Sequence, residues 1–222
     1  MLTILQGRRL TTIDKINEII KGYETVEVDL GTGSGKFIYR LAKLHRDKFF
    51  IGIDSAAERM IESSRKCIRK PTKGGLNNIL FLIEAAETLS DLLTGISNRT
   101  YINFPWGSLL EGLIKCDDTI LQNIIKIACP PKSYLEILFT YSLLYEEQEI
   151  IRRGLDILSY EYLSGQWKSN MCQHGIIVTS VQVFSNKNIK NMNSEWAKKL
   201  GYGRKRDVFK VLAEIEKQSA VC

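Results

Sequence analysis

The chain has 222 residues, 44% of them hydrophobic, which suffices for one large core, and its formal net charge at pH 7 is +6. No apolar run approaches the roughly 20 residues that a membrane-spanning helix needs, and the N-terminal charges follow a short apolar stretch, the reverse of a secretory signal. Five scattered cysteines without a Cys-x-x-Cys pair, together with only two histidines, argue against a disulfide framework and a metal site and predict a cytoplasmic protein.

Strands and helices are predicted to alternate along most of the chain. The expected elements are, in order, a β-hairpin at 2–10 turning at Gln6-Gly7, a helix at 14–21, a strand at 26–30, a helix at 35–46, a strand at 49–53, a helix at 55–70, a strand at 79–84, a helix near 86–94, a strand at 99–104, a helix at 108–128, a strand at 133–139, a helix at 145–165, and strands at 176–184 and 207–216. Such alternation predicts an α/β fold whose mainly parallel sheet is covered by helices on both faces.

The end of the chain carries a different pattern. Between 207 and 216 apolar and polar residues alternate, which indicates an antiparallel strand with one face toward solvent. A polar insertion at 185–206 precedes this strand. Because no linker or repeat interrupts the chain, we expect residues 1–222 to form a single domain that begins with a hairpin at 1–10.

A glycine-rich turn follows the first of the expected parallel strands. This strand contains Asp29 and runs into Gly31, Thr32, Gly33 and Gly35 at the start of the next helix. Glycines let backbone N–H groups approach a bulky polar ligand, because no Cβ stands in the way. A dinucleotide fold needs G-x-G-x-x-G, whereas this turn reads G-x-G-x-G and is followed by a lysine. Asp29 would repel a diphosphate but suits the ammonium of S-adenosylmethionine, so the turn favours this methyl donor over a nicotinamide cofactor.

The ends of the next strands belong to the same expected site. Asp54 follows the strand at 49–53, about 20 residues beyond the glycines, where an acid can bind ribose hydroxyls. Parallel sheets bind ligands at the carboxyl ends of their strands, so Asp54, Ala86 and Glu87 should share a rim with the turn. Ala86 and Glu87 either flank the adenine of the cofactor or are ordinary surface residues, and their position alone does not separate the two interpretations.

Phe104-Pro105-Trp106 ends the fourth parallel strand, beside the expected place of the cofactor's methyl group. Trp106 can stack on a planar acceptor while Pro105 keeps the turn rigid. A tryptophan more often packs beneath a helix, but the position at the rim favours the stacking role. Ser108 either caps the following helix or turns its hydroxyl toward the ligand.

Positive charge is concentrated in two segments. Six basic residues against one acid lie between Arg59 and Lys73, and five basic residues without an acid lie between Lys198 and Arg206. On a helix, Arg65 and Arg69 form one stripe that can follow a phosphate backbone, and Trp196 among polar and basic residues suits base stacking. A solvated basic surface is the alternative for both segments. For Arg152 and Arg153, which follow an acidic run, a local network of ion pairs is the favoured interpretation.

Together these motifs resemble the NpmA/KamB family of aminoglycoside-resistance 16S rRNA (adenine(1408)-N(1))-methyltransferases, and most nearly its NpmA branch. The resemblance covers essentially the whole chain, and its aromatic and basic motifs are far more specific than the glycine turn. The motifs that carry it are Asp29-Leu-Gly-Thr-Gly-Ser-Gly35, Ile51-Gly-Ile-Asp54, Lys70-Pro-Thr-Lys-Gly-Gly-Leu76, Phe104-Pro-Trp-Gly-Ser-Leu-Leu-Glu111, Tyr145-Glu-Glu147 with Arg153-Gly-Leu155, and Trp196-Ala-Lys198 with Gly203-Arg-Lys-Arg206.

The resemblance implies a class I, Rossmann-like methyltransferase with a mainly parallel seven-stranded sheet. It implies a monomeric enzyme that methylates N1 of adenine 1408 in the decoding site, helix 44, of 16S rRNA within the assembled 30S subunit. The implied cofactor is S-adenosylmethionine, bound by Asp29, Gly31, Thr32, Gly33, Gly35, Asp54, Ala86, Glu87 and Ser108.

The resemblance also implies roles at the substrate. Trp106 and Trp196 would clamp a flipped adenine, Phe104 and Pro105 would shape that pocket, and Ser194 would support it. The implied rRNA contacts are Arg65, Lys66, Arg69, Lys70, Arg153, Lys199, Arg204 and Arg206, the last of which would hold the distorted backbone. Two positions depart from the family pattern: Ser108 stands where threonine is expected, and Lys199 where arginine is expected, which removes the bidentate fork of a guanidinium.

Two other functions stay open from the sequence. The first is another RNA methyltransferase, such as a tRNA guanine-N7 enzyme, whose glycine turn is similar but which does not account for the tryptophan pair. The second is a non-catalytic nucleoside-binding module or a nicotinamide oxidoreductase, against which the glycine spacing argues.

Overall fold

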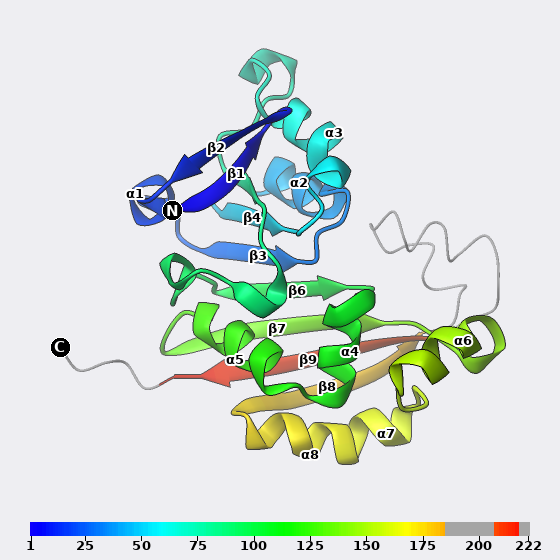
Figure 1. Cartoon of the computed structure of the whole chain (residues 1–222). Coiled ribbons are helices and arrows are strands. Elements are labelled where there is room, and N and C mark those ends of the chain that lie inside the picture. The colour runs from blue at the N-terminus through cyan, green and yellow to red at the C-terminus, as the bar shows by residue number, and fades with distance from the viewer. Residues whose placement is uncertain (185–206, 218–222) are drawn as a thin grey trace.

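The computed structural model describes residues 1–184 and 207–217, which form one nine-stranded sheet with helices around it (Figure 1). The strand order is β2-β1-β5-β4-β3-β6-β7-β9-β8. The strands are β1 (Leu2–Gln6), β2 (Arg9–Ile13), β3 (Val26–Leu30), β4 (Phe49–Ile53), β5 (Ile79–Leu82), β6 (Arg99–Asn103), β7 (Lys132–Phe139), β8 (Ile176–Phe184) and β9 (Val208–Glu216). The helices are α1 (Ile16–Ile20), α2 (Lys36–Leu44), α3 (Ala57–Cys67), α4 (Gly107–Lys115), α5 (Asp118–Ile127), α6 (Leu143–Arg153), α7 (Tyr160–Ser164) and α8 (Gln166–Gln173).

The seven strands from β3 to β9 form the expected methyltransferase sheet. Strands β5, β4, β3, β6 and β7 are parallel, and β9 inserts antiparallel between β7 and β8. The antiparallel last strand is therefore confirmed, and its buried residues are the alternating Phe209, Val211, Ala213 and Ile215 together with Val208 at its start.

The N-terminal hairpin is longer than predicted and joins the sheet. Gln6 pairs with Arg9, so the turn consists of Gly7 and Arg8 rather than Gln6 and Gly7, and the pairing continues to Ile13. Strand β1 also bridges to β5 through Ile4 and Leu82, which extends the seven-stranded sheet to nine strands.

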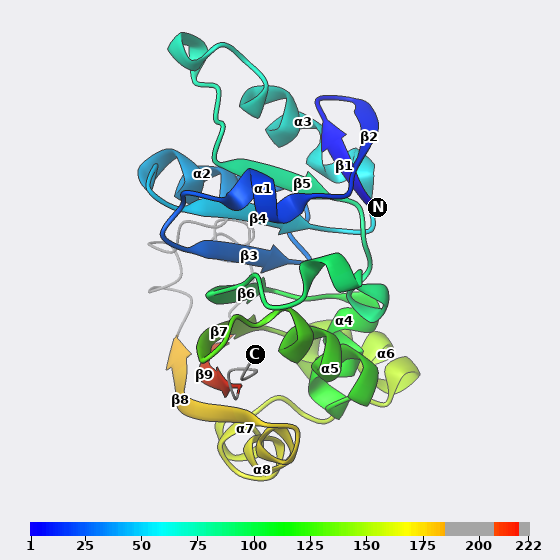
Figure 2. The same cartoon turned by 90° about the vertical axis from the view of Figure 1, so that its left-hand side faces the viewer.

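Helices cover the sheet from two sides, as the alternation predicts. Figure 2 shows α2 on one side of the sheet and α4 with α5 on the other. The fully buried strand β4 explains why both layers form: Phe50 packs with residues of α2 and α3, while Phe49 and Ile51 join the larger core of α4 and α5. A strand that is apolar on both faces is typical of the centre of a parallel sheet.

Three predicted helices are replaced or divided in the structure. Residues 86–94 form two 3₁₀ turns, Ala86–Thr88 and Asp91–Leu93, in place of a helix. The segment 108–128 divides into α4 and α5 because Cys116 takes a positive φ of 54° and the carboxylate of Asp117 accepts a hydrogen bond from the N–H of Ile120. The segment 145–165 ends its first helix at the left-handed Gly154, after which α7 and the unpredicted α8 follow.

Across residues 1–184 and 207–217, no helix has the length and apolarity to cross a membrane.

Candidate functional site

A cleft opens at the carboxyl ends of β3, β4, β5 and β6. Four carboxylates and one guanidinium lie on its wall, so the cleft favours a cationic ligand over a diphosphate. Its lining residues are Asp29, Leu30, Gly31, Thr32, Gly33, Ser34, Phe37, Asp54, Ser55, Arg59, Glu84, Ala85, Ala86, Glu87, Asn103, Phe104, Pro105, Trp106, Ser108 and Leu109. All predicted cofactor residues except Gly35 are in this set.

The three glycines of the turn are needed for different reasons. All three have positive φ, at 74° for Gly31, 56° for Gly33 and 67° for Gly35. A Cβ at Gly31 would lie 2.8 Å from Cδ2 of Leu109, and a Cβ at Gly35 would collide with the ring of Phe81. A Cβ at Gly33 would meet no atom within 4 Å. Gly31 and Gly35 are therefore needed for packing, whereas Gly33 presents bare backbone to the open cleft.

Asp29 is a buried carboxylate without a counter-charge. Its side chain accepts hydrogen bonds from Oγ1 of Thr32 at 2.5 Å and from Nδ2 of Asn103 at 3.2 Å. Burial raises the pKa of Asp29 to about 6, against the two hydrogen bonds, and the nearby charge of Asp54 adds to the rise. No lysine, arginine or histidine in the described ranges forms an ion pair with Asp29. A ligand that brings a cation to Asp29 would remove this electrostatic penalty.

Asp54 is held by the backbone on both of its oxygens. Oδ2 accepts the N–H of Gly33 at 2.8 Å, and Oδ1 accepts the N–H of Ala56 at 2.9 Å. Because a carboxylate oxygen accepts more than one hydrogen bond, both keep capacity for ligand hydroxyls. Asp54 thus ties the glycine turn to the end of β4 and remains a fixed acceptor on the wall of the cleft.

The segment after β5 forms the next part of the wall. Ala86 is buried, and its carbonyl accepts a hydrogen bond from Nδ2 of Asn123 on α5 at 2.9 Å, while Glu87 is half-buried. Glu84 also lines the cleft, and burial raises the pKa of its carboxyl group. The cleft therefore includes both Ala86 and Glu87. Their position in the sequence alone did not decide between a place at the cofactor and an ordinary surface position.

The Phe104-Pro105-Trp106 turn holds an exposed indole at the rim. Phe104 adopts a φ of 53°, a conformation that is costly for an aromatic residue. Its N–H donates to the carbonyl of Leu138 at 2.9 Å, and its ring packs on Leu138 and Val208. Pro105 is buried, whereas 52% of Trp106 is exposed. By contrast, Trp167 is fully buried and donates from Nε1 to the carbonyl of Leu113, which is a core role.

Sequence reasoning missed several residues of the cleft. Asn103 binds Asp29, Phe37 comes from α2, and Arg59 comes from the first turn of α3. Asn103 is 74 residues from Asp29 in the chain and reaches it only because β6 pairs with β3. Strand neighbours of this kind carry no local sequence signal.

Of the basic residues near the end of α3, Arg65, Arg69 and Lys70 are exposed and Lys66 is half-buried, and they do not form one helical stripe. The helix ends at Cys67, so Arg65 and Lys66 lie on its last turn, whereas Arg69 and Lys70 lie in the segment that follows. Lys66 donates to Oε1 of Glu62 at 2.7 Å. The predicted helix at 55–70 is therefore too long at its end, and the basic surface combines a helix with a turn.

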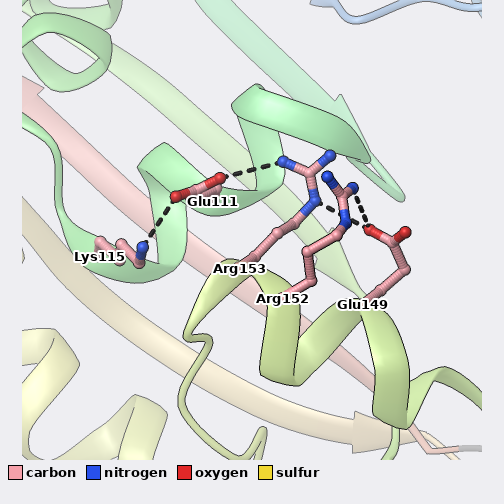
Figure 3. Close-up of polar contacts among 5 residues, drawn as sticks. All are labelled: Glu111, Lys115, Glu149, Arg152 and Arg153. Atoms are coloured by element: carbon pink, nitrogen blue, oxygen red, sulfur yellow. Dashed lines mark hydrogen bonds and ion pairs between the residues drawn. The ribbon is translucent and has the colours of Figure 1, made fainter.

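Arg153 lies in an ion-pair network that joins α6 to α4 (Figure 3). Its Nε donates to Oε2 of Glu149 at 3.0 Å, and its Nη1 donates to Oε2 of Glu111 at 3.0 Å. Arg152 shares Glu149, and Lys115 shares Glu111. The network that the sequence favoured for Arg152 and Arg153 is present, and it reaches beyond α6 to a second helix.

Five predicted site residues lie outside the described residues: Ser194, Trp196, Lys199, Arg204 and Arg206. Within the described ranges, no group of three or more histidine, cysteine, aspartate or glutamate side chains is arranged to hold a metal ion.

Comparison with known proteins shows that the chain is similar to rRNA methyltransferases over nearly its whole length. A family model described as NpmA, 16S rRNA (adenine(1408)-N(1))-methyltransferase, matches residues 3–215. A 16S rRNA (adenine(1408)-N(1))-methyltransferase of Escherichia coli is 42% identical over 219 residues, which are 97% of this chain and 100% of the relative.

Two solved structures extend the comparison. The aminoglycoside resistance methyltransferase NpmB1 is 30% identical with a TM-score of 0.81, over 96% of this chain and 100% of that chain. A tryptophan-to-alanine variant of the 16S rRNA (adenine(1408)-N(1))-methyltransferase from Catenulisporales acidiphilia, with cosubstrate SAM, is 28% identical with a TM-score of 0.86, over 100% of both chains.

Proposed function

The chain belongs to the family of 16S rRNA (adenine(1408)-N(1))-methyltransferases, and on this premise we propose that it methylates N1 of adenine 1408 in 16S rRNA of the small ribosomal subunit. The methyl donor is S-adenosylmethionine, and the consequence is resistance to aminoglycosides. The observation that carries the proposal is the family match over residues 3–215, and the acidic cleft at the strand ends supports it.

The cleft suits this methyl donor in charge and in shape. When bound, S-adenosylmethionine supplies an electrophilic methyl group on a positively charged sulfur, which keeps the bonding electrons as the methyl group leaves. Asp29 offers a buried, unpaired carboxylate to the amino group, and Asp54 offers fixed acceptors to ribose hydroxyls. Bare backbone at Gly33 permits close approach.

Methylation at N1 needs no general base. Adenine N1 carries a lone pair in the plane of the ring, so it accepts a methyl group without losing a proton and the product carries a fixed positive charge. The protein's task is to orient the two reactants and to exclude water, which is worth about 7–11 kcal/mol for well-oriented groups. No histidine or glutamate is therefore assigned a proton-transfer role.

Two tryptophans are proposed to hold the target base. N1 lies on the pairing edge of adenine, so the base has to leave its stack, at a cost of a few kcal/mol. Stacking on aromatic side chains returns roughly 1–3 kcal/mol per contact. Trp106 is exposed at the rim and suited to one side of the base. Trp196, supported by Ser194, is assigned the other side by the family pattern.

Basic residues are proposed to dock the enzyme on rRNA. Arg65, Arg69 and Lys70 are exposed, and none of them pairs with a carboxylate among the residues described. Lys66, Arg153, Lys199, Arg204 and Arg206 are assigned to the same task by the family pattern. In this structure Arg153 is held by two glutamates, so docking has to compete with them.

Resistance follows from the product. A methyl group and a positive charge on N1 occupy the edge that an aminoglycoside has to hydrogen-bond in the decoding site. The modified subunit therefore loses affinity for the drug.

A methyl-transfer assay with three acceptors tests the proposal. Purified protein is incubated with tritiated S-adenosylmethionine and either 30S subunits, protein-free 16S rRNA or tRNA, and the rRNA is then mapped by primer extension. We expect label in the 30S subunit and a stop at adenine 1408. Label in tRNA as N7-methylguanine would show a tRNA methyltransferase instead, and cofactor binding without transfer to any acceptor would show a nucleoside-binding module.

A further inference from the structure

The turn of the N-terminal hairpin is fastened to α3 by one side chain. The hydroxyl of Ser64 accepts the N–H of Gly7 at 2.8 Å and donates to the carbonyl of Leu5 at 2.7 Å. Both Ser64 and Gly7 are buried. Gly7 has a φ of 68°, and a Cβ there would lie 2.9 Å from Cδ1 of Ile68. The turn therefore sits directly against the helix, at a position where only glycine fits without strain.

This attachment brings three arginines from two distant segments into one groove. Gln6, Gly7, Arg8, Arg9, Arg65 and Ile68 line the groove, which contains no carboxylate. Arg8, Arg9 and Arg65 are exposed, and none of their side chains makes a hydrogen bond or ion pair with another residue of the described ranges. Figure 1 shows the β1–β2 hairpin beside α3.

The charges of Arg8 and Arg9 are unnecessary for the fold. The hairpin is anchored by buried apolar residues, Leu2, Ile4 and Leu5, and by the Ser64 hydroxyl. Three uncompensated guanidinium groups at one groove repel one another, and this repulsion destabilises the compact state. A phosphate backbone relieves that repulsion, and a guanidinium binds phosphate through two parallel hydrogen bonds.

We propose that the β1–β2 turn is an additional RNA-docking element, in which Ser64 positions Arg8 and Arg9 beside Arg65 to bind the phosphate backbone of rRNA. The groove continues the exposed basic segment that contains Arg69 and Lys70. The inference rests on the proposed function, because it takes ribosomal RNA as the partner. Ser64 acts as a positioning residue and does not touch the RNA.

Salt dependence of binding to 30S subunits tests the arginines. The variant is Arg8→Gln with Arg9→Gln, and its matched control is Lys15→Gln with Lys21→Gln, which removes the same charge from exposed residues beside α1. We expect the arginine variant to bind about tenfold more weakly at 0.1 M salt and the slope of log affinity against log salt to become shallower by about one to two. The control should keep the wild-type slope. Equal losses in both variants would show a general charge effect and overturn the proposal.

A double-mutant cycle tests the positioning role of Ser64. Ser64→Ala should weaken 30S binding in the wild-type background and cause no further loss when Arg8 and Arg9 are already replaced. The same loss in both backgrounds would indicate a general structural effect and overturn the role. The unfolding temperature of each variant is measured alongside.

Methylation of 30S subunits by the wild-type protein distinguishes a failure of the proposed function from a failure of the docking element alone. If the wild type does not modify adenine 1408, the proposed function fails and the docking element fails with it. If the wild type modifies adenine 1408 and the arginine variant binds as well as its control, only the docking element fails.

Discussion

Asp29 places a buried carboxylate without a counter-charge in the proposed cofactor cleft. Burial raises its pKa to about 6, above the usual 3.8. Between these values the folded state holds a proton that the unfolded state releases, so the contribution of Asp29 to stability falls as the pH rises from about 4 to 6. At neutral pH the cofactor-free protein therefore carries a destabilising ionised group.

The first prediction concerns the pH dependence of cofactor affinity. The ammonium of S-adenosylmethionine favours ionised Asp29, so the affinity should increase as the pH rises through about 6 and become constant above about 7. Below pH 6, each unit should weaken binding up to about tenfold. Isothermal titration calorimetry between pH 5 and 8 measures this dependence.

Asp29→Asn provides the matched control for that prediction. The amide oxygen can still accept the hydrogen bond from Asn103, and the amide NH2 can donate to the hydroxyl of Thr32 in place of the bond that Asp29 accepted from it, while the charge is removed. The variant should bind the cofactor more weakly, with little pH dependence near 6, and the cofactor-free variant should unfold at a higher temperature at pH 7 than the wild type. A variant that keeps the wild-type pH profile would show that another group titrates.

The second prediction concerns Trp106. Trp106→Ala should reduce kcat/KM for 30S methylation by about 10- to 100-fold, the equivalent of one lost stacking contact. Cofactor affinity and unfolding temperature should change little, because the indole is 52% exposed. Tyr160→Ala, at an aromatic residue 48% exposed on α7, is the control and should retain activity. Full activity of Trp106→Ala would refute the stacking role.

At the scale of elements, the network between α4 and α6 sets the state of Arg153. Helix α4 begins directly after Trp106, and its Glu111 holds Arg153 from α6 (Figure 3). Only 18% of the Arg153 side chain is exposed, although the family pattern assigns it to rRNA. For Arg153 to take the proposed role at rRNA, a phosphate group has to replace at least one of the two glutamates.

The third prediction follows from that competition. Glu111→Gln should release part of the guanidinium, raise the affinity for 30S subunits by a few fold, and lower the unfolding temperature slightly because α4 and α6 lose a contact. Glu161→Gln removes the same charge from the exposed surface of α7 and is the control. An equal gain in affinity in both variants would attribute the effect to net charge rather than to Arg153.

Elements with a strong local pattern were predicted correctly, and elements that depend on tertiary contacts were not. The bounds predicted for β3, β4 and β8 agree with the structure, because these strands are apolar or alternating runs between clear breaks. The break between α4 and α5 within 108–128 was missed for two reasons. Apolar residues recur at helical spacing on both sides of it, and the residue with positive φ is Cys116 rather than a glycine, which would have indicated a helix end. The helix expected near 86–94 was wrong: Ser90 caps a 3₁₀ turn, and Lys126 of α5 binds the carbonyl of Leu89.

The same distinction applies to the site. Asp29, Asp54 and Trp106 line the cleft where the sequence placed them, because each lies at or just beyond the end of a strand, and strand ends meet at one edge of a parallel sheet. Asn103 and Arg59 were missed because their places depend on which strand and which helix lie next to them. The attachment of Gly7 to Ser64, 57 residues away, was equally hidden from the sequence.

At the scale of the whole molecule, positive charge is divided between paired and unpaired residues. Cations on α4, α6 and the later strands, such as Lys115, Arg153 and Lys210, pair with glutamates. Near the end of α3 and at the hairpin turn, Lys66 pairs with Glu62, whereas the side chains of Arg8, Arg9, Arg65, Arg69 and Lys70 pair with no carboxylate within the described ranges. The net charge of +6 therefore understates the field that a phosphate-rich partner meets at this one surface.

The fourth prediction concerns the distance between this surface and the cleft. Arg59 lines the cleft, and Arg65 follows it by six positions on the same helix, so a rise of about 1.5 Å per residue places Arg65 roughly 9 Å along α3 from the cleft wall, with Arg69 beyond the end of the helix. An acceptor has to present its base to the cleft and a phosphate backbone to α3 at the same time. Arg65→Gln with Arg69→Gln should therefore reduce kcat/KM for 30S subunits about tenfold or more and make its salt dependence shallower, while cofactor affinity stays unchanged.

A short RNA hairpin that carries only the decoding site separates docking from chemistry. It can offer the target base but not the distant phosphates, so we expect the wild type to methylate it far more slowly than the 30S subunit, and the arginine variant to methylate it at the wild-type rate. The two acceptors are compared under single-turnover conditions with saturating cofactor. If the variant loses the same factor on the hairpin as on the subunit, Arg65 and Arg69 act on the cleft itself, and the separation of docking surface and catalytic cleft would be wrong.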